Sequence, residues 1–198
     1  MASVVSALLA PAVGYLCGSV LPAHLLGRLR GVDFRALGKN PGTAETWRMF
    51  GPAPALVVYA LDVAKAVIPL ILARALRVPS WSLLLTGLAA VAGHNWSLFY
   101  RFWGGKGLAT ASGVVLFFEP AYFSAAAVPG LLAWRLTGWV PASGVVGFPV
   151  LIALAWVTQT DPALRAAALL LPAVILVRAR REAAEMWARF RASRRAAR

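Results

Sequence analysis

The chain has 198 residues, of which 60% are hydrophobic and 14% charged, and its formal net charge is +13. Soluble domains carry about a quarter charged residues, so this composition excludes an ordinary soluble protein and indicates a polytopic membrane protein. Basic loops that touch anionic membrane lipids explain the positive charge. Because no recognisable nucleic-acid-binding module accompanies the charge, we expect no nucleic-acid partner.

A helix needs about 20 apolar residues to cross the hydrocarbon of a bilayer. We predict an all-α integral membrane protein with about seven transmembrane helices, and expect span 107–118, too short to cross unaided, to be tilted or partly re-entrant. The membrane domain then covers 1–178, and 179–198 form a basic cytoplasmic tail. The candidate spans are roughly 4–27, 52–75, 79–100, 107–118, 121–136, 139–157 and 163–178.

The positions of Lys and Arg predict the orientation of these helices, since basic loops stay on the cytoplasmic side. Five basic residues lie in the connection 28–51, and eight arginines lie between Arg178 and Arg198. Alternation of the spans puts both segments and Lys106 inside, so we expect the N-terminus outside and the C-terminus in the cytoplasm. An active site on this side would meet cytosolic substrates and the inner leaflet together.

The connection 28–51 is long for a simple link between two spans. Gly38, Pro41 and Gly42 exclude a continuous helix, and Asn40 adds a polar side chain. One interpretation is a basic loop that only sets topology. The other is a polar lid whose Arg48 binds a phosphate through the two-pronged hydrogen bonding that guanidinium groups favour.

Ionisable residues also occur inside the predicted spans. Asp62 and Lys65 are three positions apart and share one helical face, so they form either a self-neutralising structural pair or a functional one. His94 lies near the cytoplasmic end of the third span. Taken alone, a buried histidine that donates to a carbonyl is the simpler interpretation of His94.

A Gly104-Gly105-Lys106-Gly107 turn joins two apolar runs. Glycines let backbone N–H groups approach a phosphate closely, and lysine supplies a compact positive charge. At the edge of a membrane, this turn therefore predicts a site for a phosphorylated substrate, with Lys106 and the amides of the three glycines around the phosphate.

Several other chemistries lack their motifs. Neither His24 nor His94 is followed by aspartate in the His-x4-Asp pattern of soluble and peripheral acyltransferases. There is no Ser-His-Asp order, no metal-ligand cluster and no G-x4-G-K-[ST] sequence. We therefore expect neither a metal ion nor a cofactor.

From about Gly14 to Arg181 the chain resembles the bacterial acyl-phosphate:glycerol-3-phosphate acyltransferases, the PlsY family. The segment from Gly93 to Gly113 is similar to the second motif of the family almost throughout, and Leu61 to Lys65 resemble its Leu-Asp-x-x-Lys stretch. The resemblance implies an inner-membrane enzyme that transfers a fatty acyl group from acyl phosphate to the 1-hydroxyl of glycerol 3-phosphate. The products are lysophosphatidic acid and inorganic phosphate, and the enzyme would work beside other enzymes of phospholipid synthesis.

The motifs assign expected roles to ten positions. Arg48 and Lys106 are the expected catalytic residues. The expected substrate-binding residues are Ser19, Asn40, His94, Gly104, Gly105, Gly107, Thr110 and Arg178.

Two motifs depart from the family pattern. Lys39 stands at or near the place of the serine of the first motif, and Glu45 takes the place of its closing asparagine. Ala179 replaces the histidine of the third motif, and Arg178 or Arg180 could take over its contact with phosphate. Two alternatives therefore stay open: an impaired family member that binds phosphorylated lipid, or an enzyme that acylates a different acceptor.

Overall fold

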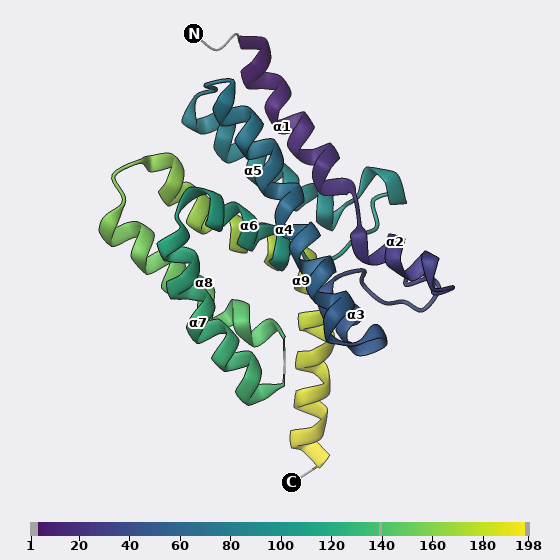
Figure 1. Cartoon of the computed structure of the whole chain (residues 1–198). Helices are drawn as coiled ribbons and strands as arrows, with labels where there is room; N and C mark the ends of the chain where they lie inside the picture. Colours follow the sequence, from purple (N-terminus) through teal and green to yellow (C-terminus); the bar gives the residue numbers. More distant parts are fainter. Residues whose placement is uncertain (1–3, 139, 197–198) are drawn as a thin grey trace.

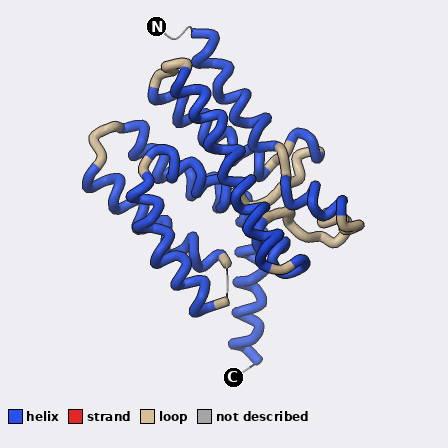
Figure 2. Tube along the Cα trace, in the orientation of Figure 1, coloured by secondary structure: helices blue, strands red, loops and turns tan. Residues whose placement is uncertain are grey.

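Helices build the described part of this chain, and no strand occurs there (Figures 1 and 2). The computed structural model describes residues 4–138 and 140–196; the side chains of Pro141 and of residues 181–196 lie outside this description. The predicted all-α class is thus confirmed. The elements are α1 Val4–Ser19, α2 Pro22–Leu29, α3 Thr43–Phe50, α4 Pro52–Ala75, α5 Ser80–Asn95, the 3₁₀ turn η1 Leu98–Tyr100, α6 Leu108–Phe118, α7 Pro120–Thr137, α8 Pro141–Thr158 and α9 Pro162–Ala196.

Three described segments are long and apolar enough to cross a membrane: Val4–Leu29, Pro52–Ala75 and Pro162–Arg180. The total of seven spans and the orientation of the termini therefore stay predictions. Helix α6 has 11 residues, which corresponds to about 16 Å, roughly half the hydrocarbon thickness. It is as short as the sequence predicts. Helix α9 runs past the predicted boundary at 178 without a break, and the tail arginines from Arg181 onward fall outside the described side chains.

The first predicted span, 4–27, is not one continuous helix. Helix α1 ends at Ser19 and α2 begins at Pro22, whose ring nitrogen has no hydrogen to continue the hydrogen-bond ladder. The carbonyl of Val20, at this break, accepts a hydrogen bond from Lys65 Nζ at 2.7 Å. The interruption therefore exposes a backbone acceptor inside the helix bundle.

Helices α1 and α5 lie side by side at backbone contact (Figure 1). A Cβ added to Gly18 would come 2.0 Å from the carbonyl oxygen of Ala90, and one added to Gly93 would come 2.2 Å from that of Tyr15. Small residues allow such close packing of membrane helices. The contact fixes the end of α5, where His94 and Asn95 lie.

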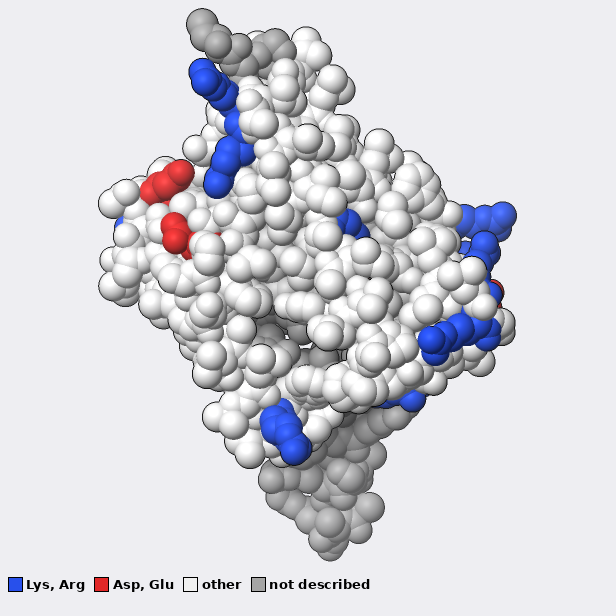
Figure 3. All heavy atoms as spheres, in the orientation of Figure 1, with Lys and Arg blue, Asp and Glu red and all other residues white. Residues whose placement is uncertain are grey.

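Charge is unevenly distributed over the face drawn in Figure 3. Lys and Arg atoms gather at its edges, including the edge formed by α2 and α3, and the middle holds few charged atoms. This distribution of charge suits a membrane protein in which the weakly charged middle of this face contacts lipid.

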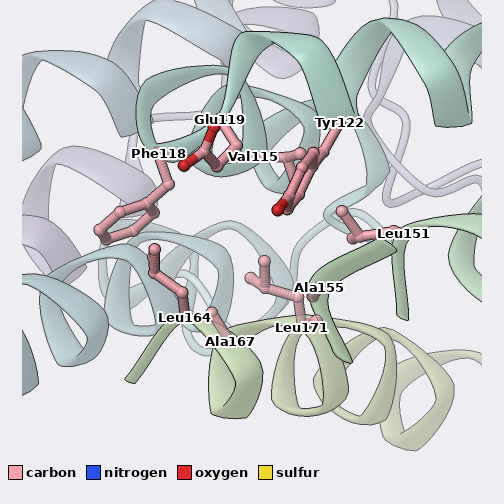
Figure 4. A pocket seen from close by; sticks show the side chains of 10 residues that line it. Val115, Phe118, Glu119, Tyr122, Leu151, Ala155, Leu164, Ala167 and Leu171 are labelled. Carbon is pink, nitrogen blue, oxygen red and sulfur yellow. The ribbon is translucent and has the colours of Figure 1, made fainter. Parts of the chain in front are cut away.

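A hollow lies among α6, α7, α8 and α9, lined mostly by apolar side chains (Figure 4). Glu119 and Tyr122 form its polar side, and Gln159 Nε2 donates to both, at 2.9 Å each. Glu119 follows the last residue of α6, so this hollow is at the opposite end of α6 from the glycine-rich turn.

Candidate active site

Arg178 connects three segments that lie far apart in the sequence. Its Nη2 donates to Asn40 Oδ1 at 3.0 Å and to the Gly104 carbonyl at 2.9 Å, and its Nε donates to the Asn95 carbonyl at 3.2 Å. The 28–51 loop, the glycine-rich turn and the start of the basic segment, which the sequence puts on one side of the membrane, therefore meet in the structure. Three predicted site residues, Asn40, Gly104 and Arg178, meet here.

The glycine-rich turn wraps closely around His94. A Cβ added to Gly104 would lie 2.1 Å from the carbonyl oxygen of His94. A Cβ added to Gly105 would lie 2.1 Å from His94 Nε2. The N–H of Gly105 donates to the His94 carbonyl at 3.0 Å. In this structure the chain itself uses this donor, and the contact of Gly105 with a substrate phosphate stays a prediction. Both glycines are needed for close packing.

Helix α6 begins two positions after Lys106. Gly107 precedes the helix with φ +81°, a left-handed conformation that suits glycine. The first N–H groups of a helix have no intrahelical acceptor, and the helix dipole adds positive potential there. Lys106 is half-buried beside these donors. This end of α6 can therefore bind an anion.

Two buried polar side chains accompany the α6 N-terminus. Asn95 and Thr110 are both 0% exposed. Asn95 Oδ1 lies 2.5 Å from the position of a Cβ added to Gly107. Within the described part of the chain, the side-chain amide of Asn95 and the hydroxyl of Thr110 have no hydrogen-bond partner. Both groups can therefore form hydrogen bonds with a ligand at the predicted phosphate site.

Asp62, Lys65 and His94 form a buried cluster behind the turn. Lys65 Nζ lies 2.8 Å from Asp62 Oδ1 and 2.8 Å from His94 Nδ1. His94 Nδ1 thus lies beside both the Lys65 ammonium group and the Asp62 carboxylate. The predicted pairing of Asp62 with Lys65 is confirmed. The simple interpretation of His94 as a donor to a carbonyl is wrong at Nδ1, whose contacts are with Lys65 and with Asp62 at 3.3 Å.

Arg48 and Glu45 form an ion pair on α3. Arg48 Nη1 is 2.5 Å from Glu45 Oε1, and Lys39 Nζ is 3.8 Å from Glu45 Oε2. The Arg48 side chain is 58% exposed. The sequence predicts a phosphate as the partner of Arg48. In the structure, the Glu45 carboxylate contacts one nitrogen of the Arg48 guanidinium group.

Ser19 packs inside the bundle. It is 0% exposed, its hydroxyl donates to the Tyr15 carbonyl at 2.8 Å and accepts from the Leu98 N–H at 3.3 Å. The structure therefore shows that Ser19 connects α1 to the residues of η1, and its contact with a substrate stays a prediction.

Sequence reasoning missed Asn95 and the contact of Lys65 with the site. Asn95 stands directly after His94 in the best-matching motif, which was the available signal. Lys65 meets His94 across 29 positions, a contact that helical spacing alone cannot reveal.

A family model described as glycerol-3-phosphate acyltransferase matches residues 8–189. Glycerol-3-phosphate acyltransferase 1 of Deinococcus radiodurans is 38% identical over 172 residues, covering 86% of this chain and 87% of that protein. A glycerol-3-phosphate acyltransferase of Thermus thermophilus is 42% identical over 136 residues, covering 68% of each chain. Nothing in these similarities favours an impaired family member.

Two crystal structures of PlsY (YgiH), an integral membrane glycerol 3-phosphate acyltransferase, are similar to the whole fold. The glycerol 3-phosphate form has a TM-score of 0.85 at 30% identity, and the lysophosphatidic acid form has 0.83 at 29%. Each comparison covers 92% of both chains. The chain therefore belongs to the PlsY family of glycerol-3-phosphate acyltransferases.

Proposed function

We propose that this protein transfers a fatty acyl group from acyl phosphate to the 1-hydroxyl of glycerol 3-phosphate, at the cytoplasmic side of the inner membrane. The observation that carries the proposal is the Arg178 guanidinium, which joins Asn40 to Gly104 two positions before Lys106. It holds the polar loop against the anion-binding end of α6. Both expected substrates are phosphorylated, and the relatives are named for the acceptor.

The chemistry needs positioning and charge neutralisation more than a strong base. The 1-hydroxyl oxygen attacks the acyl carbonyl carbon, the carbonyl carbon–oxygen bond to phosphate breaks, and the hydroxyl proton passes to the departing phosphate. Acyl phosphate is already activated, so the protein contributes orientation and electrostatic stabilisation. Lys106 and the α6 N-terminus would hold one phosphate, and Arg48 would approach the other.

The test measures release of inorganic phosphate from palmitoyl phosphate by the purified protein. Release should require glycerol 3-phosphate, and glycerol should not replace it because it lacks the anion that the site binds. Labelled lysophosphatidic acid should appear in equal amount. Acceptor-independent release would indicate hydrolysis, and release with another acceptor would favour the different-acceptor alternative. No release from a folded protein would contradict the proposal.

The cytoplasmic position of the site has a separate test. Leu37 lies in the 28–51 loop and is 54% exposed, and Cys17 is the single cysteine. In a Cys17→Ser background, Leu37→Cys should react with a membrane-impermeant maleimide in inside-out vesicles and not in intact spheroplasts. The reverse pattern would contradict the proposed orientation.

A further inference from the structure

Lys39, Glu45 and Arg48 form a trio in which one carboxylate contacts two cations. Glu45 Oε1 lies 2.5 Å from Arg48 Nη1, and Glu45 Oε2 lies 3.8 Å from Lys39 Nζ. Each carboxylate oxygen thus has its own cation. The carboxylate side chain is 15% exposed, whereas Lys39 is 52% and Arg48 is 58% exposed. The carboxylate is therefore the most buried member of the trio, and both cations remain exposed to solvent and accessible to a ligand.

The trio begins next to the site already described. Lys39 immediately precedes Asn40, which Arg178 connects to Gly104. The carbonyl oxygen of Pro41 lies 2.7 Å from the position of a Cβ added to Gly105, so this stretch of backbone rests on the glycine-rich turn. Glu45 follows in the first turn of α3. Lys39 is thus adjacent in sequence to the Asn40–Arg178–Gly104 contact, and Arg48 lies eight positions after Asn40 and is joined to Lys39 through Glu45.

We infer that Glu45 is a positioning residue that holds Lys39 and Arg48 together as a two-cation clamp, and that Lys39 is a phosphate-binding residue. The inference rests on the proposed function, because it assigns the clamp to the phosphorylated substrates of that site. The trio carries a net charge of +1, so it still attracts a phosphate dianion.

If Glu45 instead only repelled the substrate, its neutralisation would have the opposite effect on phosphate binding. A carboxylate near a phosphate repels it, so simple Coulomb interaction predicts tighter binding when Glu45 is neutralised. Long basic side chains, however, lose rotamer freedom when they bind an anion. A pair already restrained by Glu45 loses less, and neutralising the carboxylate therefore weakens phosphate binding. The sign of the change distinguishes a positioning residue from a repelling one.

The experiment compares kcat and KM of wild type, Glu45→Gln, Lys39→Gln and the double variant. Glu45→Gln should raise the KM of a phosphorylated substrate roughly two- to fivefold, the range expected for exposed ion pairs, with kcat nearly unchanged. Lys39→Gln should act in the same direction. The double variant should raise KM less than the product of the two single effects, because both act on one clamp.

Asp33→Asn is the matched control, since it removes one negative charge from the same loop, and within the described residues the ion pairs of Lys39 and Arg48 are with Glu45. Hydrogen bonds from the N–H groups of Arg35 and Ala36 lower the pKa of the Asp33 carboxyl, so it is charged at neutral pH. Its KM should equal that of the wild type. A lower or unchanged KM for Glu45→Gln would overturn the inference and leave the proposed function intact.

Binding of inorganic phosphate, measured by calorimetry, separates the two proposals. If wild type shows no turnover, the proposed function fails, and weaker phosphate binding by Glu45→Gln and Lys39→Gln still supports the clamp. Equal phosphate binding by the wild type and both variants would overturn the clamp inference.

Discussion

Arg178 reaches Asn40 across 138 positions of sequence, with 3.0 Å between Nη2 and Oδ1. The same guanidinium contacts the carbonyl oxygens of Asn95 and Gly104. A planar fork with several donors can satisfy three acceptors from one side chain, and a lysine ammonium on a flexible stem cannot reproduce this arrangement. The packing of α9 against the loop before α3 therefore depends on the chemical type of this residue as well as its charge.

Arg178→Lys should accordingly lower both stability and activity. Loss of charge-assisted hydrogen bonds is expected to reduce the free energy of unfolding by about 2 kcal/mol. The rate of phosphate release should fall at least about tenfold, since the Asn40 loop is no longer fixed on Gly104. Arg180→Lys is the control, because Arg180 is exposed on the same helix. Equal effects of the two substitutions would mean that Arg178 contributes charge alone.

Lys106→Ala should abolish acceptor-dependent phosphate release and leave the protein folded. The substitution removes the compact charge at the α6 N-terminus and little of the core, because Lys106 is only half-buried. The assay is phosphate release, with thermal unfolding in detergent as the check on folding. Retained turnover would remove Lys106 from the phosphate site.

Gly105→Ala should disturb the turn, because its new Cβ would lie 2.1 Å from His94 Nε2. Overpacking of this kind costs about 1–3 kcal/mol, and a shift of the turn would also displace Lys106. Gly42→Ala is the control, since a Cβ there meets nothing within 4 Å and its φ of −171° is open to any residue. Thermal unfolding and the KM of glycerol 3-phosphate should change for Gly105→Ala only.

Lys65→Met should destabilise the protein strongly. It leaves the Asp62 carboxylate, 1% exposed, without its 2.8 Å ion-pair partner, and such a change costs about 3–5 kcal/mol. The double variant Asp62→Leu with Lys65→Met should recover most of this loss, as measured by thermal unfolding. A double variant as unstable as Lys65→Met would indicate that the contact of Lys65 with the Val20 carbonyl is the larger contribution.

Arg48→Lys should raise the KM of a phosphorylated substrate, because a point charge cannot bind two phosphate oxygens as a planar fork does. The lysine can still pair with Glu45, so α3 should keep its stability. The measurement is steady-state kinetics with each substrate varied in turn. Unchanged kinetics would mean that Arg48 only sets topology.

Composition and one motif predict much of this fold and part of its site. The apolar runs locate the helices, and the segment from Gly93 to Gly113 locates the turn before α6. The break between Ser19 and Pro22 was missed, because the apolar run continues through it. The long-range contacts of Arg178 and Lys65 depend on how helices cross. Hydrophobic patterning describes one helix at a time and cannot specify such crossings.

Glu45 illustrates a different limit. Read in one dimension, it is a negative charge in a segment expected to hold phosphate. In three dimensions it lies between Lys39 and Arg48. Whether a substitution opposes or supports binding thus depends on its neighbours in space.

The position of Arg178 on α9 also bears on how the protein matures. During synthesis, the loop with Asn40 and the turn with Gly104 leave the ribosome well before α9, and they can enter the membrane without being fastened to each other. The site is closed only when the last helix inserts and Arg178 joins them. We therefore expect a nascent chain that has not yet delivered α9 to be membrane-bound and inactive, because it lacks the residue that joins the two halves of the site.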